Sequence, residues 1–180
     1  MQKISKSLKD TEKIAKNFTI GLKPNKRGAT LVALQGELGT GKTAFAQAMA
    51  KCLGVKRKVK SPTFVLVRKY FLPTPGVHKS FLASKKNSML AGENFYERPS
   101  FKFLFHIDAY RLKNHKELLA LGLAKILADP KHLILIEWPE NIRKALPKKR
   151  HQIHISHMLV RSLHRTHRKF KIKKVQSAIL

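Results

Sequence analysis

One stretch, residues 31–43, limits most strongly what this chain can fold into. It begins with the apolar run Leu-Val-Ala-Leu, which predicts a short buried strand. Residues 36–43, Gly-Glu-Leu-Gly-Thr-Gly-Lys-Thr, match the phosphate-loop pattern G-x-x-x-x-G-K-[ST] at every fixed position. The Ala-rich residues that follow are typical of a helix, which Gly54 would end. A strand, a glycine loop and a helix in this order are the context that a phosphate-binding loop requires.

The residue types in this loop suit a polyphosphate. Because glycine lacks a Cβ, the backbone can turn its N–H groups inward toward closely spaced anionic oxygens. The helix that begins near Lys42 adds unpaired N–H donors and the positive end of its dipole. Lys42 would contact the β- and γ-phosphates, and Thr43 would offer its hydroxyl to Mg²⁺. The alternative is a chance glycine-rich turn before a helix. The predicted phosphate contacts are Gly36, Glu37, Leu38, Gly39, Thr40, Gly41, Lys42 and Thr43.

Two later apolar segments predict strands that each end in an acid. After the first, Asp108 would hold Mg²⁺ through water or polarise an attacking water; alternatively, it merely pairs with Arg111. After the second, Glu137 stands where a phosphate-loop ATPase needs its second magnesium contact. The next residue, Trp138, would either pack beside the nucleotide or close the core. The candidate catalytic residues are thus Lys42 and Asp108, and the candidate metal ligands are Thr43 and Glu137.

Amphipathic spacing predicts two further helices. Residues 5–20 predict an N-terminal helix with Asp10 or Thr11 as its capping residue. Residues 114–128 predict one continuous helix before Asp129 and Pro130. Its inward-facing residues would be Leu118, Leu119, Leu121 and Leu123.

The middle of the chain departs from this regular pattern. Residues 64–70 predict a strand that follows Ser61-Pro62-Thr63, which either senses the phosphates or forms an ordinary turn. Residues 73–100 have no clean period and predict a long connection or insertion, partly helical around residues 79–90. Loops of this length are usually functional or disordered.

The C-terminal segment, residues 148–180, predicts a basic hairpin or tail. Residues 152–155 and 169–172 alternate between apolar and polar side chains, as the two strands of a hairpin would. The histidines at 151, 154 and 157 alternate between strand faces, so a metal site is not expected there. We therefore predict a single domain over residues 1–180.

Charge narrows the choice of partners. The chain has 180 residues, with 38 Lys and Arg against 10 Asp and Glu, and a formal net charge of +28. Either a polyanionic partner or a generally basic host proteome would account for this charge. No acid follows Glu140, so the C-terminal segment predicts a phosphate-contacting surface or a solvated tail. The single cysteine and the absence of an apolar signal core or membrane span predict a cytoplasmic protein.

Several motifs, taken in order, resemble one known family. In chain order they are LQGELGTGKT, VKSPTFVLVRKY, FHIDAYRL, KELLALGL and LILIEWPE. This set resembles the TsaE (YjeE) family, the small bacterial ATPase needed to make threonylcarbamoyladenosine in tRNA, over nearly the whole chain. The SPT, HxDxYR and EWP elements discriminate more sharply than the phosphate loop alone. Relative to the family's short turn between the SPT and HxDxYR strands, residues 73–100 are an insertion.

The resemblance implies a fold, residue roles and partners. The implied fold is an α/β phosphate-loop NTPase three-layer sandwich, with a mixed central sheet and a C-terminal β-hairpin. The glycine loop would bind ATP, Thr43 and Glu137 would hold Mg²⁺, and Asp108 would take part in hydrolysis. The family ATPase works with the TsaB and TsaD proteins. Apart from the resemblance, the charge of this chain predicts that its basic surface would hold tRNA. The implied nucleotide contacts outside the loop are Thr11, Trp138 and Arg168.

Two other functions fit parts of the pattern. A small-molecule or nucleoside kinase shares the phosphate loop, and residues 73–100 would then serve as its lid. A nucleic-acid-binding module with a vestigial nucleotide site would fit the charge. Free phosphate released from ATP favours the ATPase, whereas a phosphorylated acceptor favours the kinase. Tight RNA binding without magnesium-ATP binding favours the module.

Overall fold

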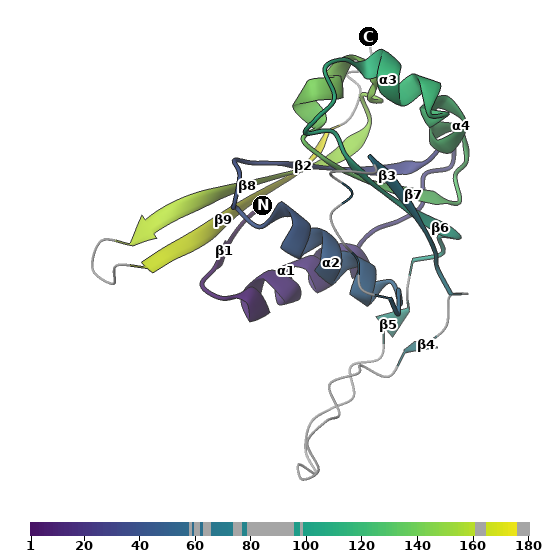
Figure 1. Cartoon of the computed structure of the whole chain (residues 1–180). Coiled ribbons are helices and arrows are strands. Elements are labelled where there is room, and N and C mark those ends of the chain that lie inside the picture. The colour runs from purple at the N-terminus through teal and green to yellow at the C-terminus, as the bar shows by residue number, and fades with distance from the viewer. Residues whose placement is uncertain are drawn as a thin grey trace.

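The computed structural model describes residues 1–57, 59, 62, 66–73, 77–78, 96–97, 99–160 and 165–175. A seven-stranded mixed sheet forms the middle of three layers, with helices on both of its faces (Figure 1). Its strand order is β1-β9-β8-β2-β7-β6-β3. The predicted α/β sandwich with a mixed sheet and a C-terminal hairpin is therefore confirmed. The strands are β1 (Gln2–Ser5), β2 (Thr30–Gln35), β3 (Val67–Phe71), β6 (Phe103–Asp108), β7 (His132–Glu137), β8 (Arg150–Val160) and β9 (Arg165–Val175).

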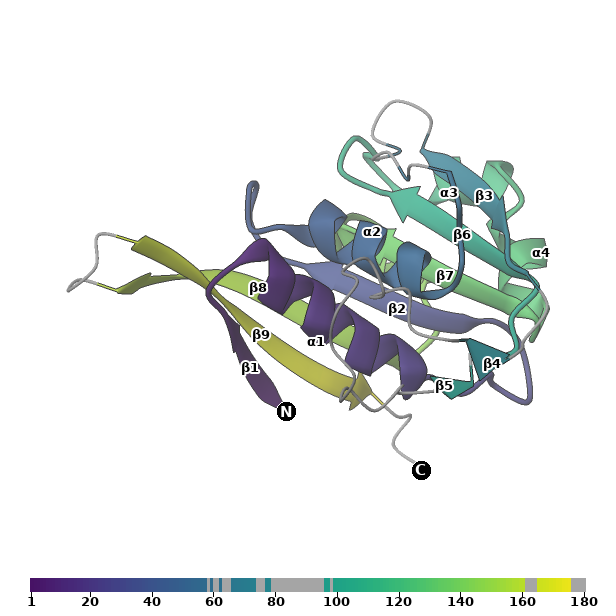
Figure 2. The same cartoon turned by 90° about the horizontal axis from the view of Figure 1, so that it is seen from below.

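The helices divide between the two faces of this sheet. Helices α1 (Leu8–Ile20) and α2 (Lys42–Cys52) cover one face, as Figure 2 shows from below. On the other face lie α3 (His115–Ala120), α4 (Leu123–Ala128) and the 3-10 helix η1 (Pro139–Ala145). Among the described residues, no helix is long and apolar enough to cross a lipid bilayer.

The central strands are parallel, and this places the candidate site. Strand β7 lies between β2 and β6 and is parallel to both, so all three strands end at one edge of the sheet. In this register Glu137 is directly opposite Asp108 on one side and Leu34 on the other. The carboxyl edge of parallel strands is where open α/β sheets bind ligands.

Alternating side chains build one core on each face of the sheet. The core under α1 and α2 includes Leu34 and Leu135 of the central strands, and it continues across the hairpin through Ile153, Ile155 and Phe170. The core under α3, α4 and η1 includes Leu31 and Ile134, and its buried residues among those described include none from β1, β8 or β9. The hairpin therefore has one packed face and one face outside the apolar cores.

The N-terminal prediction was wrong in two details. Residues 2–5 form β1, which pairs with β9, and the helix begins only at Leu8. Ser7 is the N-cap and accepts a hydrogen bond from the backbone N–H of Asp10, so neither Asp10 nor Thr11 caps this helix. Asp10 instead accepts a hydrogen bond from the backbone N–H of Lys6, which lowers the pKa of its carboxyl group.

The continuous helix predicted over residues 114–128 was also wrong. Gly122, with φ 81°, separates α3 from α4. The break turns Leu119 and Leu121 to solvent, where they are 43% and 51% exposed, while Leu118 and Leu123 stay buried. Glycine adopts this left-handed conformation without steric cost, so the helix can break there.

Part of the predicted insertion is described. Strands β4 (Val77–His78) and β5 (Tyr96–Glu97) pair antiparallel in a small second sheet, so the two ends of the segment meet. The partly helical course predicted for residues 79–90 lies outside the described residues. So do Ser61 and Thr63, the two polar residues of the predicted phosphate-sensing turn.

Candidate functional site

The glycine loop between β2 and α2 is shaped by backbone conformations that favour glycine. Gly36, Gly39 and Gly41 have φ angles of 145°, 78° and 97°. A Cβ on Gly36 would lie 2.2 Å from the carbonyl oxygen of Ile155 on β8, so no side chain fits there. Gly41 is the N-cap of α2, and it has no side chain to bond the first N–H groups of that helix. The loop therefore presents helix N–H donors at the sheet edge.

Lys42 lies inside this loop rather than in solvent. Its Nζ donates hydrogen bonds to the carbonyl oxygens of Gly36 and Glu37, at 2.7 and 2.8 Å. The same ammonium group lies 3.9 Å from the centre of the Trp138 ring, a cation–π contact. Burial lowers the pKa of Lys42 below its ordinary range. Three nearby carboxylates, those of Glu137, Glu140 and Asp108, oppose this by favouring the charged form.

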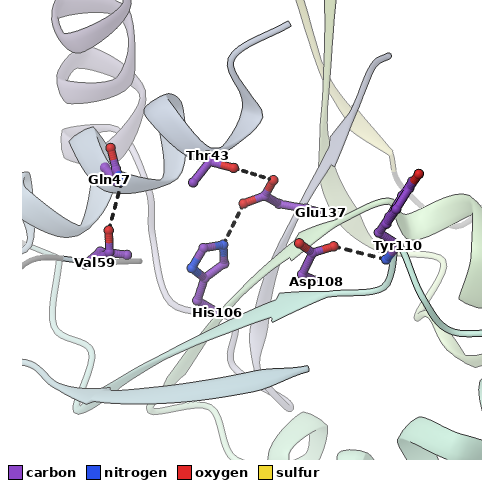
Figure 3. A network of polar contacts seen from close by, with 7 residues as sticks. All are labelled: Thr43, Gln47, Val59, His106, Asp108, Tyr110 and Glu137. Atoms are coloured by element: carbon purple, nitrogen blue, oxygen red, sulfur yellow. Dashed lines mark hydrogen bonds and ion pairs between the residues drawn. The ribbon is translucent and has the colours of Figure 1, made fainter. Parts of the chain in front are cut away.

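Thr43, Glu137 and His106 form a chain of contacts between the loop and two strands (Figure 3). The Thr43 hydroxyl donates to Oε2 of Glu137 at 3.0 Å, and Oε1 of Glu137 lies 2.8 Å from Nε2 of His106. Glu137 and His106 are both buried, so neighbouring groups, not bulk water, fix the orientation of the carboxylate. A hydroxyl and a carboxylate within hydrogen-bonding distance of each other are hard oxygen donors of the kind that Mg²⁺ prefers.

Asp108 comes to the same edge from the adjacent strand. It is 3% exposed, and its Oδ1 accepts a hydrogen bond from the backbone N–H of Tyr110 at 3.0 Å. This bond turns the chain directly after β6. Asn141 of η1 reinforces that turn, because its side-chain amide donates to the carbonyl oxygen of Ala109 at 2.8 Å. Two carboxylates, an ammonium group and a hydroxyl therefore converge from three elements.

The hairpin closes over the loop from the side. His157 and Arg168 are cross-strand partners. A Cβ on Gly41 would lie 3.1 Å from Nε of Arg168, and one on Gly39 would lie 4.0 Å from Nε2 of His157. The Nε atom of Arg168 is buried and has no hydrogen-bond partner in the part of the chain that the structure describes. An unpartnered buried cationic donor beside the loop suits an anionic ligand.

Thr11 is placed differently from the other predicted contacts. It lies in α1, its side chain is 1% exposed, and its hydroxyl lies 2.8 Å from Oγ of Ser5. Ser5 is in turn the β1 partner of Arg168. Thr11 thus supports the strand beside the loop, and its contact with adenine stays a prediction.

The structure adds two residues that sequence reasoning did not assign. His106 belongs to the motif FHIDAYRL, but a histidine inside an apolar strand also fits an ordinary core position. For His157 the sequence offers the basic segment and the histidine spacing at 151, 154 and 157, and neither predicts a contact with the glycine loop. Only the β6–β7 and β8–β9 registers bring these side chains to Glu137 and to the loop.

A family model decides the relationship that the motifs suggest. The model described as "Threonylcarbamoyl adenosine biosynthesis protein TsaE" matches residues 5–83 and 91–167. The chain belongs to the TsaE family. The resemblance inferred from the motifs is therefore confirmed, and so is the family's role in the biosynthesis of threonylcarbamoyladenosine in tRNA.

Individual relatives agree with this membership of the TsaE family. A "tRNA threonylcarbamoyladenosine biosynthesis protein TsaE" of Rickettsia bellii is 34% identical over 147 residues, which cover 81% of this chain and 79% of that protein. The protein of the same name from Bacillus subtilis is 30% identical over 144 residues, which cover 80% and 70%. The crystal structure of Bacillus subtilis YdiB superimposes with a TM-score of 0.62 over 98% of this chain and 86% of that one. At 22% identity that likeness supports the fold alone.

Proposed function

We propose that this chain is a magnesium-dependent ATPase that supports the TsaB–TsaD complex in making threonylcarbamoyladenosine in tRNA. The observation that carries the proposal is the 3.0 Å contact between Thr43, at the end of the glycine loop, and Glu137, at the end of β7. It joins the phosphate-binding backbone to a carboxylate at the carboxyl edge of the sheet. That pairing is what phosphoryl transfer from a magnesium nucleotide requires.

Three features of the site fit a triphosphate with Mg²⁺. At Gly36 the loop backbone packs directly against the Ile155 carbonyl of β8, which holds the glycine turn in place before α2. The buried Nε of Arg168 has no hydrogen-bond partner among the described residues. Thr43 and Glu137 supply two oxygen ligands, and water and phosphate oxygens complete such sites. When bound, Mg²⁺ would neutralise charge on the β- and γ-phosphates.

Each residue of the chain then has a defined task. Lys42 would exchange its bonds to the loop carbonyls for bonds to phosphate oxygens, where its charge stabilises the transferred phosphoryl group. Asp108, held by the backbone of Tyr110, would orient the attacking water. Trp138 would cover the Lys42 side of the site and limit its access to water. Arg168 would bind the phosphates from the hairpin side.

The nucleoside would lie between α1 and α2. A cavity of about 360 Å³ opens there, lined by Leu8 and Glu12 of α1 and by Ala44 and Gln47 of α2. Ala44 directly follows Thr43, so one end of this cavity lies beside the start of α2. Its other end, at the far end of that helix, is lined by Lys51, Val55 and Arg57. Thr11 lies in the same helix as Leu8 and Glu12 but does not line this cavity, so its contact with the adenine stays a prediction.

The test is to follow labelled γ-phosphate of ATP in the presence of Mg²⁺. Free phosphate is expected from the wild-type chain, and Lys42→Ala or Asp108→Ala should abolish its release. A phosphorylated acceptor in place of free phosphate would make the chain a kinase. Unchanged turnover in either variant would remove the site assignment.

The cellular role needs a second experiment. Purified TsaB, TsaD and tRNA are combined with and without this chain, and the number of modified tRNA molecules per complex is counted. Many modified tRNA molecules per complex with the chain, and about one without it, would indicate that the chain resets the complex after each modification. Equal yields would contradict the partnership while leaving ATP hydrolysis intact.

A further inference from the structure

The C-terminal hairpin has an open face that the nucleotide site does not use. Strands β8 and β9, together with β1, extend the sheet away from α3, α4 and η1, which cover its other half (Figure 1). The opposite face of the same strands packs on α1 and α2 through Ile153, Ile155 and Phe170. The described core on the α3 side includes no buried residue from these three strands. This surface, which we call the open face, is therefore available to a partner.

The open face carries a regular row of cationic side chains. Lys169, Lys171 and Lys173 alternate along β9 and point to one side, about 7 Å apart from one to the next. Cross-strand pairing adds polar neighbours from β8 and β1. Neither Asp nor Glu occurs in residues 2–5 or 150–175, so no acid on these strands offsets this charge. The polar neighbours are Gln152, His154 and Ser156 of β8 and Gln2 of β1.

We propose that the open face binds the phosphate backbone of a folded RNA, such as tRNA. The partner is chosen by charge complementarity, because a row of ammonium groups without acids attracts a polyanion. Lysines and polar side chains position a nucleic acid by its phosphates rather than by its bases. The face has few apolar side chains to anchor a protein core, since strand alternation places only Ile4, Met158 and Val175 on its described part.

The geometry keeps this surface apart from the nucleotide site. Arg168 lies between Lys169 and His167 in sequence, and alternation along β9 turns it to the opposite face, beside the glycine loop. RNA on the open face and a nucleotide at the loop therefore contact the same hairpin from two sides. The proposal does not depend on ATP hydrolysis, and we expect RNA affinity to persist without nucleotide.

The test measures binding of a labelled tRNA transcript by fluorescence anisotropy over about 50 to 300 mM salt. The variant Lys169→Gln/Lys171→Gln/Lys173→Gln should bind at least about tenfold more weakly at low salt. Its plot of log affinity against log salt should be shallower by about 2 to 3 units, because each phosphate contact contributes nearly one. A matched control, Lys116→Gln/Lys125→Gln/Lys131→Gln, removes the same charge from exposed positions near α3 and α4. It should keep most of the affinity and the wild-type slope.

Three results would overturn the proposal. They are no RNA binding by the wild-type chain, equal losses in the two triple variants, and equally tight binding of polyglutamate at the same salt. The last result would assign the face to an acidic protein. Thermal unfolding checks that the hairpin variant is folded; if it is not, Lys171→Gln alone should lower the slope by about one unit. An unchanged slope in that single variant would also reject the proposal.

Discussion

The hydroxyl of Thr43 donates to a carboxylate oxygen of Glu137 at 3.0 Å, although 94 residues separate them in sequence. Thr43 lies in the first turn of α2 and Glu137 ends β7, so the contact exists only because β7 pairs in parallel with β2. Its place at the carboxyl edge of three parallel strands links the topology of the sheet to the proposed chemistry.

Replacement of Glu137 by Gln should remove magnesium dependence while keeping the fold. The amide is isosteric, but it lacks the charge that a divalent cation requires, so we expect magnesium-stimulated phosphate release to fall about 100-fold or more. Phosphate release is measured against magnesium concentration. Glu140→Gln is the matched control, because this neighbouring acid is exposed. A comparable loss in the control would contradict a specific role for Glu137.

His106 should act as a positioning residue for Glu137. It is fully buried, and its Nε2 lies 2.8 Å from Oε1 of the carboxylate. His106→Phe keeps a ring in the strand but removes this contact, so magnesium affinity should weaken about 10- to 100-fold. Nucleotide affinity without magnesium, measured by calorimetry, should not change, and His106→Gln should restore part of the magnesium affinity. Parallel losses in both affinities would indicate a purely structural role.

Substitution of Gly36 by Ala should distort the phosphate loop. The added Cβ would meet the carbonyl oxygen of Ile155 at 2.2 Å, which only a backbone shift can relieve. We expect nucleotide binding to be lost. Gly122→Ala is the comparison, because Gly122 also has a positive φ, 81°, but no atom lies within 4 Å of its Cβ position. It should cost about 1 to 2 kcal/mol of stability and leave nucleotide binding unchanged; a loss of binding there would implicate general destabilisation instead.

Much of this site could be predicted from local sequence. The glycine pattern predicts a strand, a loop and a helix, and the acids Asp108 and Glu137 each end an apolar run. Because parallel strands end at one edge, these signals suffice to bring the loop and both acids together. The resemblance to TsaE added Arg168, which the structure places beside Gly41.

The remaining features depend on long-range register. The contact of His106 with Glu137 requires β6 and β7 to pair in one alignment, and β1 is stable only because β9 pairs with it. Neither the contact nor the strand β1 can be predicted from the local sequence. The break at Gly122 does not follow from the apolar spacing of residues 114–128, because a helix tolerates a single glycine at a cost of about 1 kcal/mol.

The split between α3 and α4 predicts unequal effects for two adjacent leucines. Leu118 is 1% exposed and Leu119 is 43% exposed, although the sequence pattern places both inward. Leu118→Ala should lower the free energy of unfolding by about 2 to 5 kcal/mol, because it leaves a cavity in the core. Leu119→Ala should change it by about 0.5 kcal/mol or less. Denaturant unfolding distinguishes the two variants. Equal losses of stability would contradict the exposed position of Leu119 and support one continuous helix.

Acid should destabilise the fold through His151. Burial, and to a lesser extent the charge of Lys174, lowers the pKa of this imidazole, whose ring packs edge-on against Phe18 of α1. The unfolded chain then binds a proton more readily than the folded chain, so this contribution to stability is complete above about pH 6.5. This contribution is lost as the pH falls below about 6.5 and through the lower pKa of the folded state. The loss is about 1.4 kcal/mol for each pH unit between the two pKa values.

The measurement is the free energy of unfolding at a series of pH values between about 5 and 8. His151→Gln does not titrate, so its stability should fall less steeply with acid than that of the wild-type chain. His154→Gln removes an exposed histidine of the same strand and should keep the wild-type slope. If His151→Gln and the wild-type chain lose stability in parallel, the acid sensitivity comes from other groups, and burial of His151 does not affect folding in this range.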